Sequence, residues 1–320
     1  MIELSTRVFE VLRKDDEFIL YRGRSKADVS QAASASHLSQ ATARPIPSEM
    51  QGAGCGHDPA SAGRSQVLVL SPALAYPRPE SLKRLEHEYS LREELDATWA
   101  ARPIEITRHW DRQVLVLEDP GGVSLDRLLG RALDLGSFLR VAISLAIAIG
   151  QLHQRGLIHK DIKPANVLVD SAASDVWLIG FGNASRRRSE RRSTDPPGFI
   201  AGTLAYMAPE QTGRMNRSID SRSDLYSLGV TLYEVLTGSL PFTASDPIGW
   251  VHCHIAREPT PPSRRLNNLP TSISAIIMKL LAKTAEETLP DRGRSGVRPQ
   301  KVSRRVGIAR TGRPVPPRCA

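Results

Sequence analysis

One ten-residue segment limits the folds open to this chain more than any other part of it. Residues 159–168 read HKDIKPANVL, which places Asp161, Lys163 and Asn166 close together in the sequence. The segment follows apolar residues with helical spacing at 138–152, and it ends in residues typical of a short buried strand. A loop held between a helix and a strand can bring a carboxylate, an ammonium and an amide to one point. The sequence therefore predicts a functional site on this loop.

Further short motifs follow this segment in a fixed order. They are Gly180-Phe181-Gly182, Gly202-Thr203, Ala208-Pro209-Glu210 and Ser223-Asp224-Leu225-Tyr226-Ser227-Leu228-Gly229. With this order and spacing, residues 7 to about 287 resemble a eukaryotic-type Ser/Thr protein kinase domain, whose catalytic loop reads H-R-D-x-x-x-x-N. More narrowly, EQTGRMNRSIDSRSDLYSLGVTLYEVLTGSLPF and VHCHIAREP resemble the kinase domain that begins very large bacterial signalling proteins, ahead of an ATPase, a GAF and a sensor histidine kinase domain.

The resemblance implies a two-lobed α+β fold that transfers a phosphoryl group from ATP, with Mg²⁺, to Ser or Thr hydroxyls of a protein. It assigns Asp161 as the carboxylate that takes the acceptor proton, Lys163 as the cation beside the transferred group, and Asn166 as a magnesium ligand. It also assigns structural roles to four residues: His159 in the catalytic loop, Glu88 in the helix of the first lobe, Glu210, which would pair with a later arginine, and Asp224, which would brace the catalytic-loop backbone.

Several positions depart from that pattern where ATP and Mg²⁺ would bind. Gly180 stands where an aspartate would bind the metal, and Leu70 stands where a lysine would pair with Glu88. Aligning LRKDDEFILYRG on the glycine-rich loop places three larger residues at its glycine positions: Arg13, Asp15 and Phe18. We therefore expect the binding of both ATP and Mg²⁺ to be weakened.

The same alignment assigns the residues that would surround the adenine ring. Leu12 and Leu20 flank the glycine-rich loop, and Leu117 would line the back of the pocket. Glu118 would offer its backbone carbonyl to the adenine amine, whereas Pro120 has no N–H to donate. Losing one hydrogen bond at about 1 kcal/mol net weakens nucleotide binding without preventing it.

The predicted elements divide the chain into two lobes. Strands are expected at 7–13, 17–22, 66–71, 103–108 and 112–118, with a helix at 79–95, so residues 1–118 form a β-rich first lobe. Within it, residues 23–65 are rich in Ser, Ala, Gly and Pro and are predicted to be a disordered insertion. Residues 119–122 form a hinge. Helices expected at 138–152 and near 224–237, 246–256 and 272–283 make residues 123–287 a helical second lobe, before a disordered basic tail at 288–320.

Nearly all of the net charge of +9 lies in the predicted tail, where residues 289–320 hold nine Lys or Arg and one Asp. Without a fold or interleaved aromatic residues, such a tail predicts no specific nucleic-acid binding. The stretch Thr288-Leu289-Pro290 stands where related domains have Arg-Tyr-Gln, and the allowed codons ACG CTA CCA encode the start of that tripeptide in a shifted frame. We therefore hypothesise a frameshift near codon 288 that truncates a larger protein. An open shifted frame encoding an ATPase would support this, and an early stop codon would contradict it.

Loss of the segment that would follow codon 288 has an expected structural consequence. It predicts that Glu210 lacks its arginine and that an apolar patch is exposed at Ile276, Ile277, Leu280 and Leu281.

The remaining features indicate a cytoplasmic protein that inserts in no membrane. The longest apolar run, at 141–149, is well short of the roughly 20 residues that a membrane span needs, and the N-terminus does not resemble a signal peptide. The three cysteines lie far apart, as in a reducing compartment. Ser189, Ser193 and Thr194 lie among arginines between the GFG and APE motifs; they are either phosphosites that pair with these arginines or part of a solvated basic loop.

Two functions stay open at this point. The first is a Ser/Thr protein kinase that uses ATP and Mg²⁺, which the intact catalytic loop favours. The second is a catalytically weak or inactive pseudokinase that keeps the fold and regulates or scaffolds a protein effector. Leu70 and Gly180 favour this second function.

Overall fold

The computed structural model describes residues 2–26, 66–130, 133–170, 175–187, 202–215 and 217–283. Most of the predicted insertion, the three candidate phosphosites Ser189, Ser193 and Thr194, and the predicted tail lie outside these residues.

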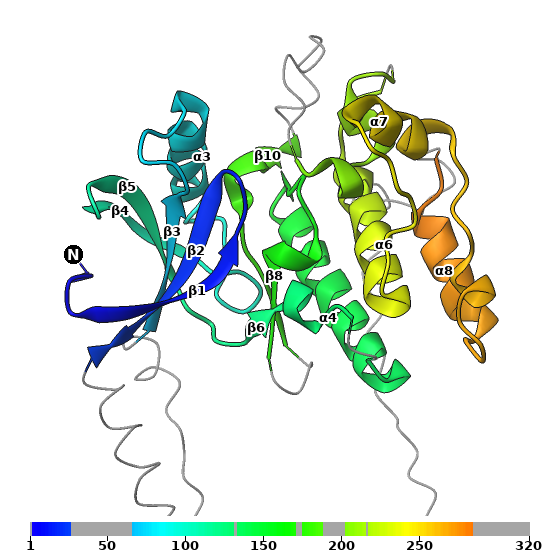
Figure 1. The fold of residues 1–320 in the computed structure, drawn as a ribbon, viewed down its shortest axis with the longest axis horizontal. Coiled ribbons are helices and arrows are strands. Elements are labelled where there is room, and N and C mark those ends of the chain that lie inside the picture. Colours follow the sequence, from blue (N-terminus) through cyan, green and yellow to red (C-terminus); the bar gives the residue numbers. More distant parts are fainter. Residues whose placement is uncertain are drawn as a thin grey trace, which may run out of the picture. The chain divides into compact units, whose positions relative to one another are not determined.

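The first lobe is built on a five-stranded antiparallel sheet with the order β1-β2-β3-β5-β4 (Figure 1). Its elements are β1 (Arg7–Lys14), β2 (Phe18–Ser25), β3 (Gln66–Pro72), α3 (Pro79–Ser90), β4 (Pro103–His109) and β5 (Arg112–Glu118). The central strands β3 and β5 are continuous apolar runs because both of their faces are covered. One face carries Val67, Val69, Val114 and Val116, and the other carries Leu68, Leu70, Leu115 and Leu117.

Two predicted boundaries in this lobe were wrong. Strand β2 continues through Ser25, so residues 23–25 do not belong to the predicted disordered insertion; they pair with the start of β1, which supplies their hydrogen-bond partners. Helix α3 ends at Ser90 and not at 95. Leu91 and Leu95 follow the end of the helix and pack into the core of the second lobe.

The second lobe is mainly helical, as predicted. Its helices are α4 (Leu135–Gln154), α6 (Ser221–Thr237), α7 (Pro247–Ala256) and α8 (Thr271–Leu280). Short strands and 3₁₀ turns lie between them: β6 (Val123–Ser124), η1 (Leu125–Leu128), β7 (Leu157–Ile158), η2 (Pro164–Asn166), β8 (Val167–Val169), β9 (Val176–Leu178), η3 (Phe181–Asn183), β10 (Ser185–Arg186), η4 (Leu204–Tyr206), η5 (Pro209–Thr212) and η6 (Pro262–Arg264). The two-lobed α+β fold expected from the sequence is therefore confirmed.

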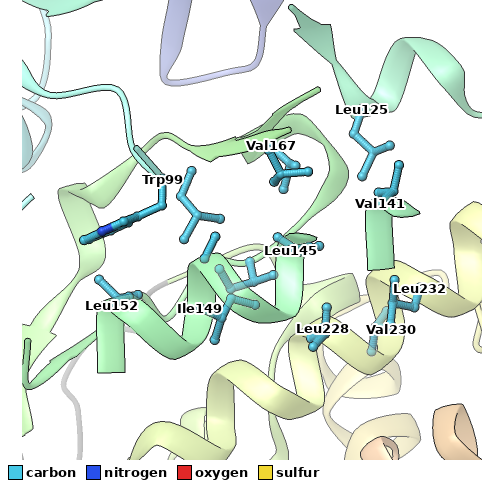
Figure 2. Packing of buried hydrophobic residues seen from close by; sticks show 14 of the residues in the cluster. Trp99, Leu125, Val141, Leu145, Ile149, Leu152, Val167, Leu228, Val230 and Leu232 are labelled. Atoms are coloured by element: carbon cyan, nitrogen blue, oxygen red, sulfur yellow. The ribbon is translucent and has the colours of Figure 1, made fainter. Parts of the chain in front are cut away.

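The core of this lobe forms between α4 and α6, which carry apolar residues at helical spacing. Figure 2 shows Leu145, Ile149 and Leu152 along α4, with Leu228 and Val230 on the neighbouring α6. Trp99 and Val167 close the same cluster from the other side of α4. This packing holds the strand β8 and the loop before it, and so positions the segment 159–168.

The predicted exposed patch on α8 was largely wrong. Ile277, Leu280 and Leu281 are buried, and only Ile276, at 56% exposure, faces outward. The reason is Gly229 of α6, where an added Cβ atom would lie 2.7 Å from the Cβ of Leu280. The glycine lets α8 lie directly on α6 and cover these side chains.

Helix α4 is long and apolar enough to cross a membrane by length and composition alone. Six of its residues are nevertheless buried inside the lobe: Phe138, Val141, Leu145, Ala148, Ile149 and Leu152. The core helix of a folded domain meets the same criteria, so the helix is explained by its packing.

Candidate active site

A cavity of about 390 Å³ lies between the first lobe and the catalytic loop. Its wall from the first lobe comes from the turn between β1 and β2, from Leu70 of β3 and from α3. The second lobe contributes the loop before β8, the residues around η3, and Gly202 and Thr203. Four of the predicted site residues meet here: Glu88, Asp161, Lys163 and Asn166.

The catalytic-loop carboxylate of Asp161 is held by hydrogen bonds on both oxygens. The Asn166 side-chain amide donates to its Oδ2 at 2.9 Å, and the backbone N–H of Thr203 donates to its Oδ1 at 2.9 Å. Lys163 Nζ lies 3.2 Å from the same Oδ2 and 2.6 Å from the Thr203 hydroxyl. This arrangement presents an oriented carboxylate beside a cation, as needed to position a hydroxyl and accept its proton.

Asp224 of α6 holds the backbone of the catalytic loop through hydrogen bonds. Its carboxylate, fully buried, accepts hydrogen bonds from the backbone N–H groups of His159 and Lys160 at 2.9 and 2.8 Å, and its Oδ2 lies 2.8 Å from His153 Nε2. Burial acts to raise the pKa of Asp224. The hydrogen bonds from His153 and His159, together with the charges of these two residues, outweigh burial, so the pKa of Asp224 is lowered. Lys160 has a φ of +66°, which an L residue rarely adopts, so these bonds hold a costly backbone conformation.

Sequence reasoning missed His153, whose only signal was a polar residue at the end of an apolar helix. His159 itself is buried against the ring of Phe181, with 4.8 Å between ring centroids, and its Nε2 lies 3.2 Å from the Ile179 carbonyl oxygen. Burial lowers the pKa of His159. Its role in this structure is to pack the loop against η3.

Glu88 of α3 is only 1% exposed and lies at the cavity wall with Leu70. Its Oε1 has no hydrogen-bond partner among the described residues. Burial raises the pKa of Glu88 to about 7, although the backbone N–H of Phe181 and the charge of Arg13 oppose the change. A lysine at position 70 would add a second cation near this carboxylate and would lower its pKa further.

Gly180 has a φ of +80°, in the left-handed region that favours glycine. A Cβ atom added there would lie 2.9 Å from Asn166 Oδ1. An aspartate at this position would therefore require Asn166 to move.

Arg13 reaches from the end of β1 into the site. Its guanidinium donates to Asn166 Oδ1 and, at 3.2 Å, to the carbonyl oxygen of Ala165. The side chain is 8% exposed and also pairs with Asp15 at 3.6 Å. The amide oxygen that the resemblance assigns to Mg²⁺ is thus taken by a cationic side chain.

Protein kinases generally use ATP with Mg²⁺, but the residues present here do not fit the metal. Asn166 is bonded to Arg13, and Gly180 has no side chain to offer. Within the ranges that the structure describes, no three His, Cys, Asp or Glu side chains are grouped so as to hold a metal ion.

The residues predicted to surround adenine lie apart from the cavity. Leu12, Leu20 and Leu117 are at most 5% exposed and pack against one another and against Leu68 and Leu168 in one cluster. None of the five predicted nucleotide-binding residues, which include Glu118 and Pro120, lines the cavity.

The hinge is tied to the sheet by a buried ion pair that the sequence did not reveal. Arg22 of β2 donates to both carboxylate oxygens of Asp119, at 2.6 and 2.9 Å, and to the carbonyl oxygen of Gly122 at 2.9 Å. The one available signal for burial of Arg22 was the alternation of side chains along the strand. Arg22 is two residues after Leu20 and four after Phe18, so all three side chains lie on the same face of β2.

Glu210 of η5 accepts a hydrogen bond from the Ser223 hydroxyl at 2.5 Å. Burial raises its pKa. Among the residues that the structure describes, it forms no ion pair with an arginine.

Comparison with known proteins agrees with this geometry. The model of the protein kinase domain family matches residues 76–292. The chain is 41% identical over 139 residues to the Ser/Thr-protein kinase PknB of Mycobacterium tuberculosis, covering 43% of this chain and 22% of PknB. It is 34% identical over 179 residues to Pkn1 of Myxococcus xanthus, and 34% identical over 152 residues to PksC of Streptomyces coelicolor. These matches cover 55% and 48% of this chain, and 25% and 27% of those proteins.

The chain thus spans about a quarter of the length of these curated relatives. The family match, however, extends over more than half of its own residues, including the catalytic loop and the helical lobe. The chain therefore belongs to the protein kinase domain family.

Proposed function

We propose that this chain is a regulatory, pseudokinase-type member of the Ser/Thr protein kinase family, which binds a protein effector without efficient Mg²⁺-dependent phosphoryl transfer. The observation that carries the proposal is the bond from Arg13 to Asn166 Oδ1. It places a fixed cation on the oxygen that would hold the metal. In a larger bacterial signalling protein, binding of the effector to such a domain would regulate the other domains.

The residues predicted to surround adenine support the same proposal. Leu117, which the resemblance assigns to the adenine pocket, is buried in one cluster with Leu68 and Leu168, so nucleotide entry beside Leu117 would have to separate apolar side chains that are buried together. Separating them exposes apolar surface to water at about 25 cal/mol per Å². Nucleotide binding must offset this cost with few compensating contacts.

Slow Ser/Thr phosphoryl transfer is the second candidate function. The observation that favours it is the hydrogen-bonded group of Asp161, Lys163 and Thr203, which is arranged to position an acceptor hydroxyl. If transfer occurs, Asp161→Asn should lower its rate by about 10²–10⁴-fold, because the acceptor proton then has no carboxylate to receive it. Single-turnover transfer from radiolabelled ATP to a protein substrate would measure this. An unchanged rate in the variant would assign the activity to another source.

Restoring the missing groups tests the main proposal. The triple variant Arg13→Gly, Leu70→Lys and Gly180→Asp releases the Asn166 oxygen from the guanidinium, gives Glu88 a neighbouring ammonium and adds a carboxylate beside Asn166, which must shift to admit it. We expect the affinity for Mg·ATP to rise by about tenfold or more for each restored charged contact, and the unmodified chain to bind very weakly. Thermal shift with ATP, with and without Mg²⁺, would measure the difference.

The matched control is the double variant Leu70→Lys and Gly180→Asp, which keeps Arg13. It should gain less affinity than the triple variant, because the guanidinium still holds the Asn166 oxygen. Strong magnesium-dependent ATP binding by the unmodified chain would refute the pseudokinase proposal and favour the second candidate.

A further inference from the structure

A lysine at the end of the helical lobe has buried partners that the proposed function does not use. Lys283 follows α8, and its ammonium donates to the Tyr226 hydroxyl and to the Cys253 carbonyl oxygen, both at 3.2 Å. The same ammonium lies 4.3 Å from the centroid of the Phe242 ring. Burial lowers the pKa of Lys283 to about 8, so the side chain is still largely charged at pH 7. A cation is therefore held between α6 and α7.

His254 of α7 has a partner on each ring nitrogen. It is only 1% exposed, its Nε2 lies 2.8 Å from the Leu204 carbonyl oxygen, and its Nδ1 lies 3.0 Å from the Tyr226 hydroxyl oxygen. Burial lowers the pKa of His254 to about 4, so the ring is neutral at pH 7. A neutral imidazole has one N–H donor and one acceptor nitrogen, so the two partners decide where its proton lies.

The proton positions follow from what each partner can donate or accept. A carbonyl oxygen only accepts, so Nε2 of His254 must donate to Leu204. Nδ1 is then an acceptor, and the Tyr226 hydroxyl must donate to it. The Tyr226 oxygen keeps a lone pair, which accepts from the Lys283 ammonium. The three bonds therefore run in one direction, from the ammonium through the phenol and the imidazole to the carbonyl.

The last of these bonds lies beside the candidate active site. Leu204 follows Thr203, whose N–H donates to Asp161 Oδ1 at 2.9 Å. Leu204 also begins the 3₁₀ turn η4, in which its carbonyl accepts a long bond, at 3.4 Å, from the Met207 N–H. The bond from His254 is the shorter of the two, so it contributes more to fixing this carbonyl. A shift of the carbonyl would move the neighbouring Thr203 N–H away from Asp161.

We infer that Lys283 is a positioning residue for the Asp161 carboxylate and acts on it through a hydrogen-bond relay. The relay consists of Tyr226 and His254 and ends on Leu204. It connects the C-terminal end of the described lobe with the catalytic loop. The inference concerns the geometry around Asp161 and holds for either candidate function, so it goes beyond the proposed function.

The first measurement is the tautomer of His254 in the full, unmodified chain, read from its ring nitrogen resonances by NMR. We expect the proton on Nε2 at pH 7, with Nδ1 unprotonated, because the Leu204 carbonyl can only accept. The His254→Gln variant assigns the resonances by their loss. A proton on Nδ1, or a charged ring at pH 7, would overturn the inference without any variant in the relay having to fold.

The second measurement is the deuterium exchange of the Thr203 amide, also by NMR at pH 7. Tyr226→Phe keeps the ring and removes the hydroxyl, so exchange should become about two- to tenfold faster, as expected for the loss of one hydrogen bond. Lys283→Met keeps an apolar stem without a donor and should act in the same direction. Lys283→Arg keeps the charge and its donors and should restore most of the protection, which a role in packing alone does not predict.

Tyr233→Phe is the matched control, because Tyr233 is also buried on α6 but donates its hydroxyl to the Thr260 carbonyl oxygen at 2.8 Å, outside the relay. It should leave the exchange of the Thr203 amide unchanged, with far-UV circular dichroism verifying that each variant is folded. Equal acceleration in the Tyr226 and Tyr233 variants would indicate a general loss of stability and would overturn the inference, as would unchanged exchange in Tyr226→Phe. Neither measurement uses ATP, so a failure of the proposed function gives a different result from a failure of this inference.

Discussion

Replacing Asp224 with alanine is expected to lower the free energy of unfolding by about 3–5 kcal/mol. The substitution removes the acceptor for the backbone N–H groups of His159 and Lys160 and the partner of His153, all inside the second lobe. Buried donors then stay unpaired, and the positive φ of Lys160 loses the bond that holds it. Such a loss is a large fraction of the 5–15 kcal/mol typical of a domain. Urea denaturation followed by circular dichroism would measure it.

The nearby Asp220→Ala variant is the control for this prediction. Asp220 caps the N-terminus of α6 through a bond from Arg222 N at 2.8 Å, and its loss should cost only about 1 kcal/mol. Because the pKa of Asp224 is lowered in the folded state, its stabilising contribution is present above the usual value of 3.8 and is lost as the pH falls below it. Equal costs for the two variants would show that Asp224 does not brace the loop.

Glu88→Gln is expected to stabilise the domain at pH 8 by up to about 3 kcal/mol. Burial raises the pKa of Glu88 from 4.5 to about 7, so between these values the folded state keeps a proton that the unfolded state releases. The stability of the unmodified chain should therefore fall as the pH rises from 4.5 to 7. Glutamine does not titrate, so its advantage should be full above pH 7 and absent below pH 4.5. Urea denaturation at a series of pH values would measure this.

Two further variants separate the causes of that effect. Glu86→Gln, on the exposed side of α3, should leave the pH profile of stability unchanged. Leu70→Lys should flatten the profile without removing the acid, because a neighbouring ammonium favours the ionised carboxylate. A pH profile identical in Glu88→Gln and in the unmodified chain would contradict the raised pKa.

Several features of the site could be predicted because they depend on short stretches of sequence. The spacing of Asp161, Lys163 and Asn166 in the loop after a helix predicts that they come together, and they line one cavity. Alternation and helical periodicity predicted the strands β3 to β5 and the helices α4, α6, α7 and α8 to within a few residues. The errors fell at β2 and α3, whose ends depend on pairing with β1 and on packing against the second lobe.

The contacts that change the functional interpretation join residues far apart in the chain. Arg13 meets Asn166 across 153 positions, and Arg22 meets Asp119 across 97. The sequence placed Arg13 at a glycine position of the aligned loop, but it did not show where the guanidinium would lie. Only the folded site shows that the guanidinium reaches the Asn166 oxygen.

The sequence by itself determined the family, the two-lobed fold and the catalytic-loop residues, because motif order and periodicity are local properties of the chain. It also marked Leu70 and Gly180 as the positions where the chain departs from the pattern of the family. The tertiary structure alone decided which side chains surround these positions: a cluster of packed leucines that includes Leu70, Arg13 on the Asn166 amide oxygen, and a buried Glu88 at the cavity wall. Side-chain packing, burial and pairing decide these outcomes, and each depends on which distant segments the fold brings together.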